Sequence, residues 1–265
     1  MGHINDIGLA LGSGAARGLA HIGVLKALEE YGIDIDIISG SSAGALIGGL
    51  YCCGISPEMI RKLAIQIDKK MWMDITVPRK GVLKGDKIEE ILKLVTGGRK
   101  IEELDKKLII IATDLNKSEK VVITKGPVYR AIRASISIPG VFEPVRIGNK
   151  TLVDGGVVDR VPVTVLKDEG IDFVIAADVG FSDYQSRLFH VFDIIQRSID
   201  IMAERILEVD LAYADILLKP SLSHIESSKF EMVDECFEIG YNATIKEMDN
   251  IISALENHNS NIKET

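Results

Sequence analysis

Short apolar segments bounded by glycine alternate with longer segments of helical periodicity along this chain of 265 residues. Ile22, Leu25 and Leu28 repeat at three-residue spacing, which predicts a helix over about residues 16–31. Ser56 followed by Pro57 is typical of a helix start. A helix of small residues is expected after the segment 40–44, ending at about residue 53. Further helices are expected over residues 57–70, 86–95 and 231–256, and one of about twenty residues is expected between 179 and 216.

Strands are predicted where apolar residues cluster between turn residues. The expected strands are 7–11, 35–38, 108–112, 120–124, 145–147, 151–153, 173–179 and 216–218. A strand, a helix and a second strand in succession favour a parallel pair, whereas the short turn 148–150 predicts a hairpin. The sum is a three-layer α/β/α fold with a mainly parallel central sheet.

We expect a single domain over residues 7–256, followed by a polar tail over 257–265 that is disordered. No stretch rich in proline, serine and glycine divides the chain. With 46% hydrophobic and 26% charged residues, the composition is that of a globular protein and excludes disordered and collagen-like classes.

The net charge of −8 argues against a protein that binds nucleic acid over its whole surface, so no nucleic-acid partner is expected. Cys52, Cys53 and Cys236 form neither a disulfide framework nor a metal-ligand spacing. The first residues lack the pattern of a secretory signal, and no apolar run approaches the roughly 20 residues of a membrane span. These features predict a cytoplasmic protein that meets lipid, if at all, from the water side.

A glycine-rich loop, Gly12-Ser13-Gly14-Ala15-Ala16-Arg17-Gly18, lies between the first predicted strand and the first helix. Such a loop presents backbone amides at a helix N-terminus, where negative charge is favoured. Three functions use that geometry: a dinucleotide site, a nucleoside phosphate site and an oxyanion hole. The dinucleotide pattern requires its third glycine where Arg17 stands, and no Gly-Lys-Ser/Thr follows for a P-loop. A plain tight turn is the structural alternative.

A second motif, Gly40-Ser41-Ser42-Ala43-Gly44, matches G-x-S-x-G with Ser42 at its centre. In a nucleophile elbow the turn between strand and helix is sharp, and Gly40 and Gly44 allow it where larger side chains would collide. The motif lies between a predicted strand and a predicted helix, as an elbow must. The pattern therefore predicts that Ser42 is a nucleophile.

A serine nucleophile needs a base within hydrogen-bond reach, and the residues leave two answers open. His190 and His224 come late enough in the chain for a Ser-Asp-His triad. Asp154, at the start of the glycine turn Asp154-Gly155-Gly156, is the other candidate base. Alternatively, Asp154 is only a turn residue without a catalytic role, because Asp favours turns by itself.

The three motifs GSGAARG, GSSAG and DGG, in this order, resemble the patatin-like phospholipase family in its small bacterial form. The resemblance extends to Ala134-Ser135-Ile136-Ser137-Ile138-Pro139, to Phe142 and Pro144, to the segment 214–220 and to Gly240-Tyr241, and so covers residues 7 to about 254.

The resemblance implies a Ser-Asp dyad on a patatin-like fold, with no metal and no organic cofactor. Ser42 would attack a lipid ester carbonyl, and Asp154 would act as the general base. The amides of Gly12, Ser13, Gly14 and Ala15 would hold the oxyanion, with Arg17 bracing the loop. Many relatives carry Asn shortly after DGG, where this chain has Asp159-Arg160, and this departure bears on substrate preference.

A basic segment runs from Arg61 to Lys87, with eight Lys or Arg against three Asp and the single tryptophan, Trp72. Basic residues around an apolar group suit an anionic lipid surface. The hypothesis is that this segment caps the mouth of the site and contacts anionic membrane; the alternative is a solvated helix face with a buried tryptophan.

The favoured prediction is thus a serine acyl hydrolase acting on phospholipid, lysophospholipid or neutral lipid esters. Its rivals are a Ser-His-Asp esterase that uses His190 or His224, a nucleotide-binding module that uses the glycine loop, and a catalytically idle interaction protein on the same fold.

Overall fold

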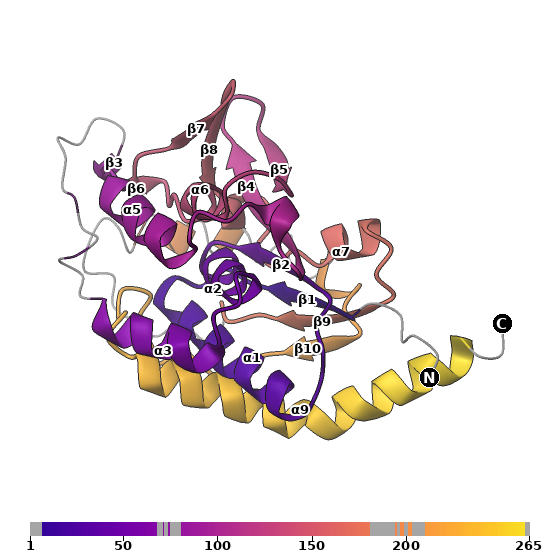
Figure 1. Ribbon diagram of the computed structural model, residues 1–265. Helices are drawn as coiled ribbons and strands as arrows, with labels where there is room; N and C mark the ends of the chain where they lie inside the picture. The colour runs from indigo at the N-terminus through magenta and orange to yellow at the C-terminus, as the bar shows by residue number, and fades with distance from the viewer. Residues whose placement is uncertain are drawn as a thin grey trace.

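The computed structural model describes residues 7–67, 71, 74, 81–180, 194, 197–198, 201–202 and 210–262. Its sheet is built on five parallel strands in the order β10-β9-β1-β2-β4 (Figure 1). Their bounds are β1 Ile7–Leu11, β2 Ile37–Ser41, β4 Lys107–Asp114, β9 Phe173–Ala177 and β10 Ile216–Leu218. Three antiparallel strands complete the sheet: β5 Glu119–Ile123, β7 Val145–Ile147 and β8 Lys150–Asp154. The predicted mainly parallel sheet is confirmed.

The strands β2 and β8 meet end to end along the same edge of β4. Within β4, Ile111 pairs with Ser41 of β2 and the next residue, Ala112, pairs with Asp154 of β8. Both strands lie opposite β5, which pairs with the other edge of β4. Because β2 is parallel and β8 antiparallel to β4, their carboxyl ends face each other. The topology thus brings residues from two distant parts of the chain together.

The sheet is covered on both faces, because alternate residues of each strand point to opposite sides. Leu9 and Leu11 join the larger core, whereas Ala10 between them joins the second core. The helices over the larger core are η1 Ala15–Leu19, α1 Ala20–Glu30, α2 Ala43–Cys52 and α9 Val233–Ile262. The other face is covered by a segment with α7 Thr164–Asp168 (Figure 1). The three-layer α/β/α fold is therefore as expected.

The remaining elements surround this core, and among them α3 and α6 contact α2 (Figure 1). They are α3 Pro57–Gln66, β3 Gly81–Leu83, α5 Asp86–Val95, η2 Ile101–Glu103, α6 Val128–Ser135, β6 Gly140–Phe142 and η3 Gly155–Val157. The Ser56 cap is present, since its hydroxyl accepts the Met59 amide at 3.4 Å, and α5 has the predicted bounds. Among the described helices, none has both the length and the apolar character to cross a bilayer.

Several element boundaries differ from the sequence pattern by one or more residues, and α6, α7, β3 and β6 were not predicted. The second strand begins two residues later than expected and continues to Ser41, so the elbow motif starts inside the strand. The last helix continues to Ile262, because no glycine or proline follows Glu256 to end it. In addition, the His258 ring packs against the Phe173 ring, with 5.8 Å between the ring centroids. Residues 257–262 of the predicted tail are therefore helical. Most of the helix expected between 179 and 216 lies outside the described residues.

Candidate active site

Ser42 lies in the sharp turn between β2 and α2. Its backbone has φ +53°, in the left-handed region that residues with a side chain rarely adopt. A Cβ atom at Gly44 would lie only 2.0 Å from the carbonyl oxygen of Leu11, so glycine alone permits α2 to pack this close to β1. The turn has the strain and the close packing of a nucleophile elbow.

Asp154 lies at the end of β8, within hydrogen-bond distance of Ser42. The Ser42 hydroxyl donates to Asp154 Oδ2 at 2.6 Å, and the other carboxylate oxygen, Oδ1, accepts the Gly156 amide at 2.8 Å. Thr113 Oγ1 donates to the Asp154 carbonyl at 2.8 Å. A Cβ atom at Gly155 would lie 2.3 Å from the Ile111 carbonyl, so the glycine after Asp154 lets β8 end against β4. The carboxylate is therefore aimed at the serine by its own turn and by β4.

The glycine loop lies beside Ser42, but two of its four predicted oxyanion donors are occupied. The Gly12 amide donates to the Ala177 carbonyl at 3.0 Å, and the Ser13 amide to the Arg160 carbonyl at 2.9 Å. The amides of Gly14 and Ala15 have no acceptor among the described residues. This corrects the expectation from the sequence, because β9 and the segment after η3 use the first two amides to hold the loop in place.

Two buried side chains brace the glycine loop. Arg17 Nη1 donates to the Gly180 carbonyl at 2.7 Å, as the bracing role implies. His21 Nε2 lies 2.8 Å from the Gly12 carbonyl, which only accepts, so Nε2 carries the proton. Burial lowers the pKa of His21 to about 4 and so keeps the ring neutral. The sequence placed His21 in a helix without a role; a polar ring on the buried face is the only signal it offered.

The end of α6 and the residues after it hold Ser42 and Asp154 by their backbone amides. The Ser42 amide donates to Ser135 Oγ at 2.9 Å, and the Asp154 amide donates to the Ser137 carbonyl at 3.0 Å. Both serines are fully buried. Sequence reasoning found this segment only as part of a family resemblance and gave neither serine a function.

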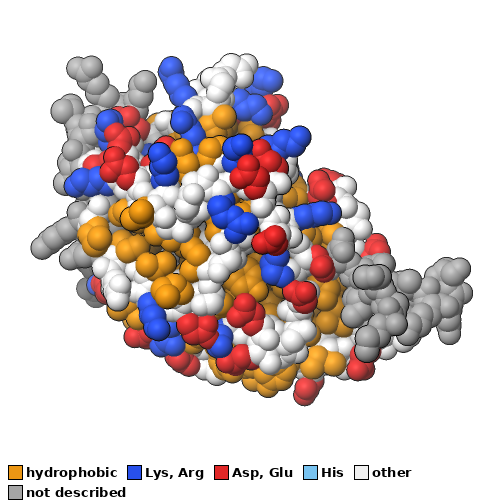
Figure 2. Space-filling model, in the orientation of Figure 1, with side chains coloured by type: hydrophobic (Ala, Val, Ile, Leu, Met, Phe, Trp, Pro, Cys, Tyr) orange, Lys and Arg blue, Asp and Glu red, His pale blue; other side chains and the backbone are white. Residues whose placement is uncertain are grey.

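An apolar cavity of about 200 Å³ opens next to Ser42. Figure 2 shows hydrophobic side chains gathered on this face, where α2, α3 and α5 come together in Figure 1. Those three helices supply most of the walls: Ala43, Leu46, Ile47 and Leu50 from α2, Ile60, Leu63 and Ala64 from α3, and Ile88, Ile91, Leu92 and Val95 from α5. The cavity has the chemistry of a hydrocarbon site.

A second, much smaller pocket also borders Ser42 and has a larger polar share in its lining, so we call it the polar pocket. It is lined by Ser13, Gly14, Ala15, Ser42, Ile138, Pro139, Asp154, Gly156, Val157 and Arg160. Ala15, Ser42 and Ile138 line both spaces. The serine therefore stands where an apolar cavity meets a polar one.

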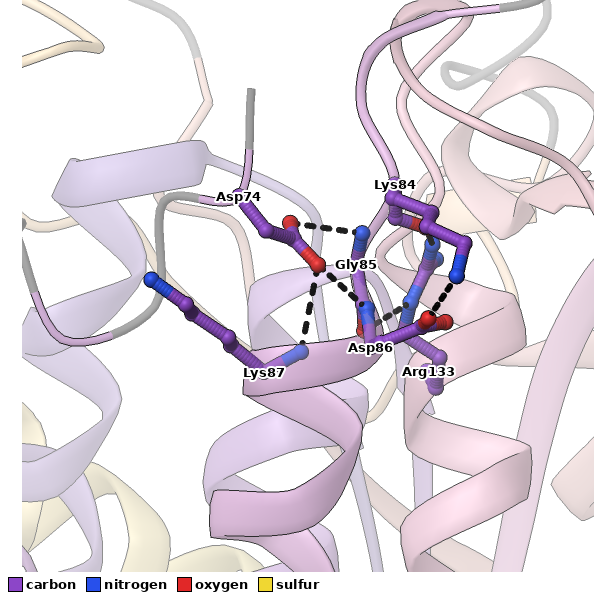
Figure 3. A network of polar contacts seen from close by, with 6 residues as sticks. All are labelled: Asp74, Lys84, Gly85, Asp86, Lys87 and Arg133. Carbon is purple, nitrogen blue, oxygen red and sulfur yellow. Dashed lines mark hydrogen bonds and ion pairs between the residues drawn. The ribbon is translucent and has the colours of Figure 1, made fainter. Parts of the chain in front are cut away.

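A polar network fixes the start of α5, which forms one wall of the apolar cavity (Figure 3). Asp74 Oδ1 accepts the Gly85 amide at 2.7 Å, and Oδ2 accepts the amides of Asp86 at 2.7 Å and Lys87 at 3.2 Å. Burial raises the pKa of Asp74, but these amide hydrogen bonds outweigh it and leave the pKa below its usual value. A distant carboxylate thus caps this helix.

Arg133, on α6, is part of this network (Figure 3). It also contacts the segment that holds the strand of Asp154. Its Nε donates to the Gly85 carbonyl at 3.0 Å, and its Nη2 to the Lys84 carbonyl at 2.8 Å. Its Nη1 donates to Ser137 Oγ at 2.6 Å, and the carbonyl of Ser137 accepts the Asp154 amide. The wall of the cavity and the candidate base are connected through buried contacts.

Of the two candidate histidines of a triad, His224 does not line this site. His224 Nε2 contacts Glu235 Oε1 at 2.7 Å, near the start of α9, and no described histidine lines either cavity. His190 lies outside the described residues. The geometry favours Asp154 as the partner of Ser42.

The residues Asp159 and Arg160, which depart from the pattern of many relatives, frame the site. The Asp159 carbonyl accepts the Ser41 hydroxyl at 2.6 Å, and its carboxylate pairs with Lys120 at 3.0 Å. Burial raises the pKa of Asp159, against the opposing effect of Lys120. Arg160 lines the polar pocket, so this departure concerns the polar pocket and leaves the contact between Ser42 and Asp154 in place.

The basic segment from Arg61 to Lys87 is only partly described, and Trp72 lies outside the described residues. Arg61 contacts Asp234 at 2.8 Å and Glu238 at 3.6 Å, both on α9, and Lys84 pairs with Asp86. Two of the basic residues in this segment are thus neutralised by neighbouring acids.

Comparison with known proteins agrees with this architecture. Residues 9–167 match the family model described as patatin-like phospholipase. The chain is 38% identical, over 67% of its length, to half of an uncharacterised NTE family protein of Mycobacterium tuberculosis. It is 36% identical, again over 67% of its length, to 13% of the lysophospholipase NTE1 of Yarrowia lipolytica. The chain therefore spans at most about half the length of these curated relatives.

Among solved structures, VipD from Legionella pneumophila shares the fold, with a TM-score of 0.63 and 14% identity over 97% of this chain and 67% of that one. At that identity the likeness concerns the fold alone. The match to the family model covers more than half of the chain, from the first strand past the Asp-Gly-Gly turn. On this evidence the chain belongs to the patatin-like phospholipase family.

Proposed function

We propose that this protein is a serine acyl hydrolase that cleaves carboxylic esters of lipids through Ser42 and Asp154. The observation that carries the proposal is the 2.6 Å hydrogen bond from the Ser42 hydroxyl to the Asp154 carboxylate. It lies where a cavity with hydrocarbon character meets a polar pocket. A nucleophile, a base and a binding site for an acyl chain thus occur at one place.

In the first half of the reaction, Ser42 Oγ attacks the ester carbonyl carbon while its proton passes to Asp154 Oδ2. The carbonyl oxygen becomes an oxyanion, for which the amides of Gly14 and Ala15 are the unoccupied donors of the glycine loop. One such donor contributes on the order of 3–4 kcal/mol in enzymes of this type. The bond to the alcohol then breaks, the alcohol leaves with the proton from Asp154, and the acyl group stays on Ser42.

In the second half, Asp154 takes a proton from a water molecule whose oxygen attacks the acyl carbon. The bond from carbon to Ser42 Oγ breaks, and the proton returns to Ser42. His21, Arg17, Ser135 and Ser137 do not react; they hold the loop, the elbow and Asp154 in position.

The apolar cavity supports a substrate with a long acyl chain. Its walls are aliphatic side chains of α2, α3 and α5, and burying methylene groups among them is favourable by about 0.8 kcal/mol each. Some relatives are named lysophospholipases, so lysophospholipids are the first class to test here.

The proposal includes contact with an anionic membrane near the cavity mouth. Ile65 on α3 and Leu94 on α5 are 53% and 82% exposed, and both helices line the cavity. We expect Trp72 fluorescence to change with vesicles containing phosphatidylglycerol and not with phosphatidylcholine alone. Unchanged fluorescence, while product still forms from the anionic vesicles, would overturn the contact.

The experiment that tests the proposed function is hydrolysis of p-nitrophenyl esters by the wild type and three variants. Ser42→Ala and Asp154→Asn are each expected to lose activity by a factor on the order of 10⁴. The His190→Ala/His224→Ala double variant is the matched control and should retain most of its rate.

Intact-mass detection of a fluorophosphonate adduct runs beside this assay, with the adduct expected on wild type and absent from Ser42→Ala. Loss of activity with the histidines would indicate a triad instead. A wild type without activity and without adduct would overturn the hydrolase and favour the idle interaction protein. Thermal stabilisation of that wild type by NAD or ATP would favour the nucleotide-binding module.

A further inference from the structure

Ser13 carries a buried hydroxyl for which the contacts described above supply no partner. Its side chain is 8% exposed, and Oγ makes no hydrogen bond with any described residue. The neighbouring buried serines differ: Ser39 Oγ donates to the Pro162 carbonyl at 2.7 Å and Ser41 Oγ to the Asp159 carbonyl at 2.6 Å. Because buried hydroxyls are nearly always paired, this one points to a ligand.

The Ser13 hydroxyl borders the same small space as the Asp154 carboxylate. A Cβ atom built on Gly156 would lie 2.4 Å from Ser13 Oγ and 3.1 Å from Asp154 Oδ1. Gly156 therefore lies against both groups, and all three residues line the polar pocket together with Ser42. The pocket's volume of about 20 Å³ accommodates about one water molecule and excludes a lipid head group.

We propose that Ser13 Oγ and Asp154 together hold the water molecule that hydrolyses the acyl-enzyme. This inference rests on the proposed function. Once Ser42 Oγ carries the acyl group, it no longer donates to Asp154, so Oδ2 of that carboxylate can accept a hydrogen bond from water instead. The water donates its other hydrogen to Ser13 Oγ, which leaves its lone pair for the acyl carbon.

Attack then forms the bond from the water oxygen to the acyl carbon and passes one proton to Asp154. The bond from the acyl carbon to Ser42 Oγ breaks, the proton returns to Ser42, and the fatty acid leaves. Ser13 exchanges no proton; it orients the water by keeping the second hydrogen bound.

The proposal separates the two halves of the reaction. Attack by Ser42 does not use this water, so Ser13→Ala should leave acylation nearly unchanged and slow deacylation. The glycine loop keeps its position, because the backbone amide of Ser13, not its side chain, donates to Arg160. Ser39→Ala is the matched control, since it removes a buried hydroxyl that lines neither cavity.

The test is rapid-mixing kinetics with a p-nitrophenyl ester, in water and with added methanol. Methanol has one O–H, which it donates to Asp154, and so has none for Ser13. For Ser13→Ala we expect the acylation rate and the fluorophosphonate labelling rate to stay within twofold of wild type. Hydrolytic deacylation should fall about tenfold, and the ratio of methyl ester to fatty acid should rise by a similar factor.

The ratio is measured only on acyl-enzyme that has formed, so an unfolded fraction of the variant does not alter it. An unchanged ratio would overturn the role of Ser13 in holding water. If fluorophosphonate labelling of Ser13→Ala slows by the same factor as its turnover, the role in holding water is overturned, and Ser13 instead stabilises the oxyanion. A wild type that forms no adduct would instead overturn the proposed function.

Discussion

Two regions meet at Ser42, and their walls are made differently. On the polar side, backbone groups hold the geometry: the Gly12 and Ser13 amides are tied to carbonyls, and Asp154 is held through its own amide and carbonyl. On the apolar side, most of the wall consists of aliphatic side chains from three helices, α2, α3 and α5, which pack without hydrogen bonds of their own. The geometry around Ser42 and Asp154 should therefore tolerate little change, whereas single side chains can alter the shape of the apolar cavity.

The largest expected effect concerns His21, on the polar side, as a dependence of stability on pH. Burial lowers its pKa in the folded protein to about 4, against about 6.5 in the unfolded chain. The unfolded chain therefore binds the proton first. The contribution of neutral His21 to the free energy of unfolding is therefore complete above about pH 6.5. It decreases by about 3 kcal/mol as the pH falls to about 4.

Urea denaturation at pH 7 and at pH 4.5, on wild type and His21→Asn, measures this effect. Between pH 7 and pH 4.5 the free energy of unfolding should fall less in His21→Asn than in wild type. The carboxylates titrate in both proteins alike, so the difference between the two decreases reports on His21. Equal losses would mean that His21 is not a buried neutral group.

The next effect is on the apolar side, where Ala64 of α3 lines the cavity. Ala64→Phe places a ring in the space of the acyl chain and should lower kcat/KM for a p-nitrophenyl ester with a twelve-carbon chain by about 30-fold, or about 2 kcal/mol. The acetate ester should react within twofold of wild type.

Ile65→Phe is the matched control, because the adjacent Ile65 is exposed and does not line the cavity. An equal decrease for both chain lengths in Ala64→Phe would place the acyl chain elsewhere.

A smaller effect tests whether the elbow needs its external partner. Ser135→Ala removes the acceptor of the Ser42 amide, so the strained turn should lose its fixed geometry and kcat should fall about tenfold with KM little changed. Ser135→Thr retains a hydroxyl and should restore most of the rate. A rise in KM alone would show that Ser135 acts on substrate binding and not on the elbow.

The smallest effect concerns Asp74, which caps the start of α5, one of the helices that line the cavity. Asp74→Ala should destabilise this helix by about 1 kcal/mol, which increases hydrogen exchange of its first-turn amides. Turnover of the acetate ester should stay at the wild-type rate. Lower turnover of that ester would show that Arg133 transmits the change to Asp154.

Much of this protein was predictable from local pattern. Apolar segments predicted the parallel strands, Ser56 and Pro57 predicted the start of α3, and the local pattern predicted the bounds of α5, because these signals act within about ten residues. The G-x-S-x-G spacing located Ser42 for a related reason: a turn that sharp tolerates only small residues at Gly40 and Gly44. The pair Ser42 and Asp154, however, came from family resemblance, since the residues alone left the base open.

Only the tertiary structure determined which residues from distant parts of the chain contact one another. Pairing of Ser41 and Asp154 with adjacent residues of β4 brings together two motifs more than a hundred residues apart, and no local signal encodes that register. Likewise, the occupied amides of Gly12 and Ser13, the acceptor on Ser135 and the proton on His21 depend on partners from other elements. The sequence determined which residues can turn sharply or pack tightly, because those are local properties. Hydrogen-bond partners and cavities arise between elements, so the folded chain alone determined them.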